Sequence, residues 1–395
     1  MHEGASSRLY LNRSLQIVFS VTLMAVLGVS SITPAFPRIV QELGISTESV
    51  GLLITAFTIP GVLLTLLLGI LADRFGRKKI LVPGLLLFGV AGSLCFLASD
   101  FDILLVLRFF QGIGAASLGS LNVTIIGDLF SGADRNAAMG YNASVLSIGT
   151  AGYPAIGGLL ATIGWNFPFL LPSFAVPIGL IVLFSLDSPE PKAPEQMTAY
   201  LRGAWHEIKN PLVIGLFFAS TMTFVVLYGP YMTYIPIFLD SSFGVSSFII
   251  GLVMSAASVI TAVVSSQMPK LTRVTSTVWL VRASFILFGV SLLLVPLVTN
   301  IWTILLPVMI VGAAIGINIP SVHTLLAGQA SLENRGAVMS LNGMVLRLGQ
   351  SIGPVLSGAL YVQWGLDLLF IIGALLALVA FILLLTILSP PRESI

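Results

Sequence analysis

The sequence contains few charged residues and one cysteine. Charged side chains make up 9% of its 395 residues, against about 25% in a typical soluble domain, which leaves too little polar surface for a water-soluble globular enzyme. Hydrophobic residues make up 56%, so intrinsic disorder is excluded as well. The one cysteine, Cys95, excludes an internal disulfide and any cysteine cluster for zinc or an iron–sulfur centre. We therefore expect no cofactor and no bound metal.

Apolar stretches long enough to cross a bilayer recur along the whole chain. A spanning helix needs about 20 apolar residues, so twelve helices with short loops fit this length and leave no room for a large extramembrane domain. A transmembrane β-barrel is excluded, because its strands would be about 10 residues long with alternating polarity. The sequence predicts an all-α integral membrane protein. Its helices are expected at 15–36, 49–72, 80–98, 102–127, 137–163, 166–186, 212–239, 247–268, 277–298, 301–326, 336–361 and 366–388.

Lysine and arginine are concentrated on one side of the predicted membrane. With the N-terminus inside, 14 of the 18 basic residues fall in inner segments and only Arg38 falls in an outer loop. The other three, Arg108, Arg282 and Arg347, lie within predicted helices. Because basic residues gather in cytoplasmic loops, this distribution predicts that both termini are cytoplasmic. The compact loops favour a bacterial or archaeal plasma membrane.

The two halves of the chain align without gaps at an offset of 200 residues. Matched arginine, asparagine and proline residues are not explained by apolar composition, so we predict two six-helix bundles, 1–186 and 212–395. The linker, 187–211, is proline-rich at first and then suited to a short interfacial helix. Parallel six-helix repeats are a known transporter plan, with the substrate site near the midplane. The matched pairs include Arg135 and Arg335, Asn142 and Asn342, Pro154 and Pro354, and Gly158 and Gly358.

Four segments carry more specific patterns. They read GILADRFGRKK (69–79), RFFQGIGAAS (108–117), GTAGYPAIGG (149–158) and LGVSSITPAFP (27–37). Together they resemble the signature motifs of the major facilitator superfamily, in its twelve-helix drug:proton antiporter branch, and the resemblance covers the whole chain. It implies the fold of that family, with two pseudo-symmetric six-helix bundles, and transport by alternating access.

The segment between the second and third helices is the candidate gate. Its glycines allow a tight turn and close approach of helices. The resemblance implies that its acid faces the N-terminal end of a helix in the other half and that its basic residues pair with an acid near the fourth helix. An acid at a helix N-terminus is favourable, so the cluster would latch one state. The alternative is that the basic residues of this segment serve only to keep it on the cytoplasmic side of the membrane. The candidates are Gly69, Asp73, Arg74, Gly76, Arg77 and Asp128.

Three basic residues within helices are candidates for coupling. Arg108 is expected about 9 Å deep, and a charge at depth is functional by default. The resemblance associates it with proton transfer, whereas the alternative is an arginine that reaches the headgroups. Arg347 is expected about 16 Å deep, where it would bind an anionic group, modulate a proton site or hydrogen-bond carbonyls between helices. His323 is either a titrating group or a hydrogen-bonded histidine.

Other polar and aromatic side chains are candidates for the substrate cavity. Tyrosines at helical spacing in the seventh helix would either stack on an aromatic substrate or serve packing. The set is Asn122, Asn142, Tyr228, Tyr231, Tyr234, Asn318, Asn342 and Gln350.

No aspartate or glutamate lies in the middle of any predicted helix. Many members of the antiporter branch carry one in the first helix, so proton coupling would run through acids at the membrane edge, through His323, or not exist. A substrate cavity without aspartate or glutamate argues against strongly cationic drugs as substrates, because such drugs are usually matched by buried carboxylates. A neutral, zwitterionic or anionic amphiphile fits Arg108 and Arg347 better.

Small residues and prolines mark expected sites of helix packing and kinking. The resemblance associates the motif of the fifth helix with export, although Tyr153 stands where glycine is usual before the proline. The packing candidates are Pro34, Pro37, Gly112, Gly149, Gly152, Pro154, Gly158, Gly353 and Pro354.

These features favour a proton-coupled exporter of small hydrophobic or amphipathic compounds. The alternatives are an uncoupled or differently directed carrier of a metabolite, such as a sugar or an organic anion, and a lipid flippase. Catalysis would need convergent reactive groups at depth, and only His323 is available, so we do not expect an enzyme. The expected partners are a small-molecule substrate, protons and the lipid bilayer, without nucleic acid, for a protein that acts as a monomer.

Overall fold

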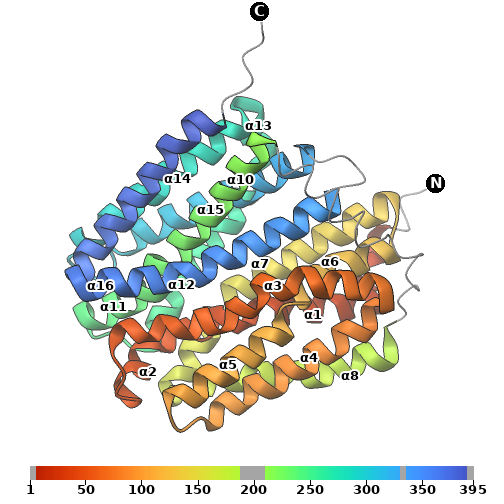
Figure 1. Cartoon of the computed structure of the whole chain (residues 1–395), viewed down its shortest axis with the longest axis horizontal. Helices are drawn as coiled ribbons and strands as arrows, with labels where there is room; N and C mark the ends of the chain where they lie inside the picture. Colours follow the sequence, from red (N-terminus) through yellow and green to blue (C-terminus); the bar gives the residue numbers. More distant parts are fainter. Residues whose placement is uncertain (1–5, 187–209, 330–334, 389–395) are drawn as a thin grey trace, which may run out of the picture. The chain divides into compact units, whose positions relative to one another are not determined.

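The computed structural model describes residues 6–186, 210–329 and 335–388, and every regular element in these ranges is helical (Figure 1). Eleven helical runs are long and apolar enough to cross a membrane. The last, Arg335–Ile387, has 53 residues, which would measure about 80 Å as one helix. It is broken at Gly365, where φ is 75°, and therefore holds two spans. The predicted all-α membrane fold is confirmed. The interfacial helix expected in the linker lies outside the described residues.

The chain divides into two compact units, each described here by itself. The first comprises Met1–Glu195 with Ser246–Ser255, and the second comprises Gln196–Val245 with Ala256–Ile395. The stretch Ser246–Ser255, which the sequence places in the second half, thus groups with the first unit.

In the first unit, α1 packs against α6 and α7, while α5 packs against α3 and α4. The first span is interrupted at Pro34 and Pro37, which lie buried in η2 and at the start of α2. Proline removes a backbone donor and clashes with the preceding turn, so α1 cannot continue through this segment. The elements are η1 (Ser6–Leu11), α1 (Arg13–Ser30), η2 (Thr33–Ala35), α2 (Phe36–Glu42), η3 (Thr47–Gly51), α3 (Leu52–Phe75), α4 (Arg77–Leu94), η4 (Cys95–Leu97), α5 (Phe101–Ala115), α6 (Leu118–Leu129), α7 (Gly132–Ile163), η5 (Phe167–Phe174) and α8 (Ala175–Ser185).

In the second unit, α10 packs against α16, and α14 packs against both α15 and α16. The seventh span contains a π-helical segment, η6, with Pro230 inside it. The elements are α10 (Pro211–Val226), η6 (Leu227–Tyr234), α11 (Ile235–Phe243), α12 (Ser247–Ser266), α13 (Met268–Val274), α14 (Thr277–Leu294), η7 (Val295–Leu297), α15 (Leu305–Gln329) and α16 (Arg335–Ile387). The first part of α12 belongs to the other unit.

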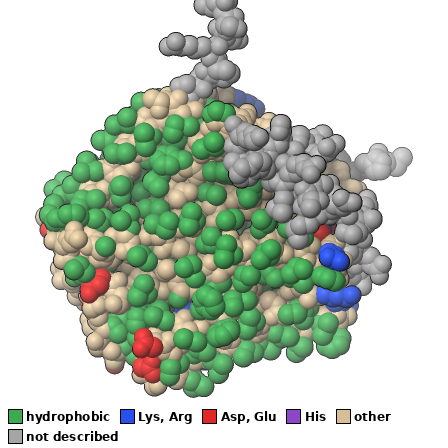
Figure 2. Space-filling view, in the orientation of Figure 1, with side chains coloured by type: hydrophobic (Ala, Val, Ile, Leu, Met, Phe, Trp, Pro, Cys, Tyr) green, Lys and Arg blue, Asp and Glu red, His purple; other side chains and the backbone are tan. Residues whose placement is uncertain are grey.

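Large apolar side chains lie on the surface as well as in the core. Leu63 is 67% exposed and Phe184 is 80% exposed, whereas Phe88 and Phe285 are fully buried. Hydrophobic side chains cover much of the face seen in Figure 2, and charged ones show in few places. Soluble monomers rarely expose apolar patches of this extent, so this surface suits contact with lipid.

Candidate functional site

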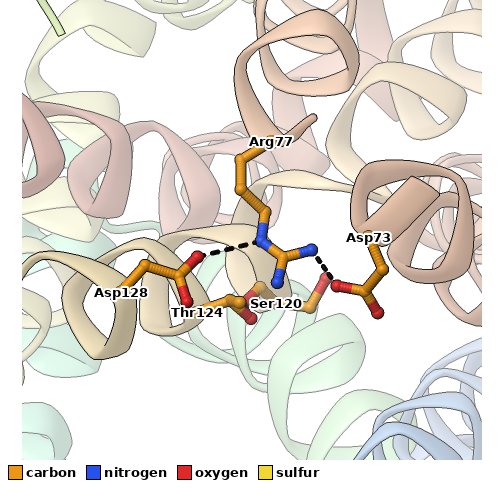
Figure 3. Close-up of polar contacts among 5 residues, drawn as sticks. All are labelled: Asp73, Arg77, Ser120, Thr124 and Asp128. Carbon is orange, nitrogen blue, oxygen red and sulfur yellow. Dashed lines mark hydrogen bonds and ion pairs between the residues drawn. The ribbon is translucent and has the colours of Figure 1, made fainter. Parts of the chain in front are cut away.

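Arg77 joins two acids at one end of the first unit. The α3 helix ends at Phe75, and α4 begins at Arg77 after a single residue, Gly76. Gly76 has φ of 106°, a conformation in which any side chain would be strained, so glycine makes this abrupt turn possible. The Nε atom of Arg77 donates to Oδ2 of Asp128 at 3.1 Å, and its Nη1 atom donates to Oδ1 of Asp73 (Figure 3). The structure therefore brings together three of the four charged residues predicted for the gate.

The three charged groups differ in their access to solvent. The Arg77 side chain is 12% exposed, Asp128 is 34% exposed and Asp73 is 52% exposed. Because Arg77 is the least exposed and bonds both acids, it ties the turn between α3 and α4 to the end of α6. Ion pairs with exposed carboxylates contribute about 0–1 kcal/mol each, so the cluster holds these helices together weakly.

Two other residues of the predicted gate stand apart from this cluster. The guanidinium carbon of Arg74 lies 5.4 Å from the ring centre of Phe75, and the ion pairs of the described chain do not include Arg74. A Cβ atom built on Gly69 would have no described atom within 4 Å. Packing within the described residues therefore gives no reason for this glycine.

Arg108 is fully buried in the first unit and points towards α3. Its Nε atom donates to the carbonyl of Leu53 at 3.1 Å, and its Nη1 atom donates to Oε1 of Gln111 at 2.6 Å. Its guanidinium carbon lies 4.3 Å from the centre of the Phe57 ring, within the range of a cation–π interaction. Since its exposure is 0%, the side chain does not reach the headgroups as the alternative reading supposed.

Sequence reasoning missed the partners of Arg108. Gln111 follows it by three residues, a spacing that places both on one face of a helix, so this partner was open to prediction. Leu53 and Phe57 come from another helix, and their contact with Arg108 depends on how α3 packs against α5. Gly112 makes that packing close, because a Cβ atom built there would lie 2.8 Å from the carbonyl carbon of Phe57.

The asparagines predicted for the substrate cavity of the first unit join three helices. The hydroxyl of Thr22 on α1 lies 2.5 Å from Oδ1 of Asn142 on α7 and accepts a hydrogen bond from Nδ2 of Asn122 on α6. The exposures of Thr22, Asn122 and Asn142 are 2%, 2% and 7%. These amides therefore face neighbouring helices and hold α1, α6 and α7 together.

The second unit contains a comparable buried network. Thr223 on α10 donates to Oδ1 of Asn318 on α15 at 2.9 Å, and Asn318 donates from Nδ2 to Ser284 on α14 at 2.8 Å. Ser220 donates to Oδ1 of Asn342 on α16 at 2.7 Å. Buried polar groups are stable only when they are hydrogen-bonded, and here the bonds connect four helices of one unit.

A small cavity lies beside this network. Its volume is about 10 Å³, roughly the room that one water molecule needs. His323 is half-buried and contributes to its wall, while Gln350, another cavity candidate, is half-buried but does not line it. The lining residues are Ser220, Phe224, Asn318, Ile319, Val322, His323 and Leu346.

The three tyrosines of the seventh span do not form one accessible stripe. Tyr231 is 4% exposed, and Tyr234 is fully buried with its ring centre 5.4 Å from that of Tyr361. Tyr228 is half-buried, and its ring centre lies 5.7 Å from that of Phe224. The spacing argument assumed an α-helix, whereas Leu227–Tyr234 is π-helical, and its wider turn redistributes the side chains. Of the three, only Tyr228 is not fully buried.

Arg347 lies on α16, the helix that packs against α10 and η6. It is twelve residues into α16, about 18 Å along the axis, and its side chain is half-buried. Arg347 therefore places a half-buried positive charge within a span of the second unit.

The glycines of the predicted packing motifs differ in what they contact. A Cβ atom at Gly149 would lie 3.0 Å from side chains of Leu23 and Val26 on α1, and one at Gly353 would lie 2.7 Å from the carbonyl of Val225. Gly158 approaches the backbone of Ser247 within the first unit. A Cβ atom built on Gly152 would come no closer to the described side chains than 4.0 Å, at Cδ1 of Ile156. Pro154 and Pro354 are buried inside α7 and α16.

The described residues form ion pairs at Arg38–Glu42, Arg77–Asp73 and Arg77–Asp128. All three lie at helix ends, whereas Arg108 and Arg347 lie within spans. This arrangement suits recognition of polar groups and movement of helices.

The sequence model described as the Major Facilitator Superfamily matches residues 18–277 and 231–395. Multidrug resistance protein 1 of Bacillus subtilis (strain 168) is 27% identical over 354 residues, which cover 89% of this chain and 90% of that protein. The quinolone resistance protein NorA of Staphylococcus aureus (strain MRSA252) is 23% identical over 367 residues, with coverage of 89% and 90%.

Among solved structures, the fold resembles that of a bacterial homologue of the human lysosomal transporter Spinster, in an inward-facing and occupied conformation. The TM-score is 0.81 at 17% identity, over 96% of this chain and 97% of that one. At this identity the likeness concerns the fold alone.

Proposed function

The chain belongs to the major facilitator superfamily, and from this premise we propose that it exports small hydrophobic or amphipathic compounds as a secondary active transporter. The observation that carries the proposal is the similarity to a multidrug resistance protein over 89% of the chain. The protein is a multi-pass membrane protein. We place it in the plasma membrane with both termini in the cytoplasm, because 14 of its 18 basic residues then lie inside.

We propose that the two units move against each other to expose the substrate site to each side in turn. Hydrogen-bond networks within each unit support this mechanism, because Thr22, Asn122 and Asn142 connect helices of the first unit and Asn318 connects helices of the second. Units tied internally in this way suit motion as bodies. The cluster around Arg77 is the proposed gate, since its bonds are weak enough to change between states.

We propose that export is driven by protons. The middle of the spans holds no aspartate or glutamate, so the proton has to bind elsewhere. Asp73 and Asp128 at the edge of the first unit are candidates, and so is His323, which is half-buried against a cavity in the second unit. Arg108 would tune this exchange through its positive charge.

Drug tolerance and dye efflux test the proposed export. In a bacterial host that lacks its own pumps, expression of the chain should raise tolerance to some members of a broad panel of amphipathic inhibitors. Efflux of an accumulated dye should stop when a protonophore collapses the proton gradient. If no compound in the panel changes tolerance and no dye leaves faster than in the vector control, export of such compounds is excluded.

A further inference from the structure

We propose that α13 and the first turn of α14 form a surface of the second unit that binds the headgroup of an anionic phospholipid. This surface, the α13 surface, consists of Lys270, Arg273, Val274 and Trp279. It goes beyond the proposed export and does not depend on it, because it requires only that the chain lies in a membrane. The helix α13 connects two consecutive spans, α12 and the span that begins with α14, so it has to lie where the bilayer meets water.

Two basic side chains of α13 are exposed and lack an acidic partner. Lys270 and Arg273 are three residues apart on one helix, a spacing that leaves about 5–6 Å between their Cβ atoms. Within the described residues, neither side chain forms an ion pair. Like charges at this spacing repel each other, and an anion bound between them removes the repulsion.

The acids of the second unit lie too far from α13 to serve as that anion. The sequence from 241 to 332 contains no aspartate or glutamate, and in the described part of this unit the acids are Asp240 and Asp367. The helix α12, about 30 Å long, separates Asp240 from α13. About 26 Å of helix separates Asp367 from Leu384, whose carbonyl accepts a hydrogen bond from Nε of Arg282 on α14.

The first unit neutralises the corresponding turn with its own acids. There Arg77 bonds both Asp73 and Asp128. At the offset of 200 residues that aligns the two halves, Arg273 stands in place of Asp73, and Gly328 stands in place of Asp128. The second unit has neither acid and carries a base at one of their positions, so its positive charge is left for a partner outside the chain.

Exposed apolar side chains flank the two bases. Val274 directly follows Arg273 and is 88% exposed, and Trp279 is 43% exposed. The hydroxyl of Ser276 accepts a hydrogen bond from the backbone N–H of Trp279 at 3.2 Å, and the Trp279 ring centre lies 6.5 Å from that of Phe381 on α16. These contacts hold the indole at the end of the span, where tryptophan is enriched because its ring is apolar and its N–H is polar.

Bases beside exposed apolar side chains suit a phospholipid better than a soluble anion. The phosphate of the lipid meets the two bases, while its acyl chains meet the apolar side chains, as they do on interfacial helices. Each lysine or arginine near the membrane surface strengthens binding to anionic lipid about fivefold. Two such residues therefore give a preference of more than tenfold for an anionic over a zwitterionic headgroup.

Competition between two lipids that differ in headgroup charge tests the α13 surface. The purified full chain in detergent is mixed with equal amounts of dioleoylphosphatidylglycerol and dioleoylphosphatidylcholine, and native mass spectrometry measures which lipid binds first. We expect the wild-type chain to prefer phosphatidylglycerol at least tenfold. The double variant Lys270→Gln, Arg273→Gln should lower this preference at least fivefold, whereas Lys270→Arg, Arg273→Lys keeps both charges and should retain it.

Two controls separate lipid recognition from general charge and from folding. Arg335→Gln removes an exposed base from the start of α16 in the same unit and should leave the preference within about twofold of wild type. The melting temperature of the double variant without lipid should stay within a few degrees of wild type, because both replaced side chains are exposed. Glycerophosphoglycerol, the same headgroup without acyl chains, should not displace the lipid at equal concentration.

Equal binding of the two lipids, an unchanged preference in the double variant, or an equal loss in Arg335→Gln overturns the α13 surface. Displacement by glycerophosphoglycerol overturns the assignment to a lipid. These outcomes are distinguishable from failure of the export proposal. A chain that moves dye without a lipid preference keeps the export and loses the surface, and a chain that shows the preference but moves no compound keeps the surface and loses the export.

Discussion

Asp73→Asn removes one charge from the proposed gate and leaves the side chain nearly the same size. In the structure Asp73 pairs with Arg77 four residues later, and its side chain is 52% exposed. A pair of this kind contributes about 0.3–0.5 kcal/mol to stability, which corresponds to roughly a twofold change in an equilibrium constant. The variant should therefore insert and fold normally, and its melting temperature in detergent should stay within a few degrees of wild type.

Transport should respond much more strongly than stability does. If the charge of Asp73 is used in switching between states, we expect dye efflux to fall at least tenfold at equal expression, far beyond the twofold effect of a static pair. The assay is efflux of a preloaded dye from cells, normalised to the amount of protein in the membrane.

The chain offers a matched control at Glu42. It pairs with Arg38 at 3.4 Å across the same four-residue spacing, and its side chain is also 52% exposed. Glu42→Gln thus removes an equivalent surface ion pair away from the proposed gate and should leave efflux unchanged. Normal efflux from a normally expressed Asp73→Asn variant, or an equal loss in Glu42→Gln, would refute the gating role.

Two further predictions concern the packing of α5. Arg108→Met leaves buried acceptors without a donor, among them Oε1 of Gln111. Each such acceptor should lower the stability of the protein by about 1–3 kcal/mol, as measured by thermal unfolding in detergent. An unchanged melting temperature would contradict the buried contacts of Arg108. Gly112→Ala should destabilise the protein by about 1–3 kcal/mol, because the added Cβ would overlap the backbone of Phe57. Gly119→Ala is the control and should be harmless, because a Cβ there would meet no described atom within 4 Å. Equal stability of the two variants would contradict the close packing at Gly112.

Much of the fold was predictable because it follows from length, hydropathy and the placement of charge. The runs of apolar residues predicted the spans, and the break at Gly365 divides the last helical run where the sequence placed a loop. The family resemblance around Gly76 implied that basic residues there pair with Asp128, and Arg77 forms this pair in the structure.

The surroundings of individual side chains were harder to predict, because they depend on packing between helices. Asn122 and Asn142 were expected to face a cavity, but both are buried against Thr22, and polar residues at depth serve either purpose. Regular helical spacing suggested a tyrosine stripe in the seventh span. The π-helix around Pro230 changes that spacing.

Flux of a fluorescent amphiphile into proteoliposomes under an imposed pH gradient tests proton-driven export most directly. Purified chain is reconstituted, the gradient is set by dilution, and internal pH is followed with a trapped indicator. The account predicts that the compound moves only with a gradient, that its movement carries protons in the opposite direction, and that Asp73→Asn abolishes both. Flux of the same rate without a gradient, or flux without any change of internal pH, would contradict it.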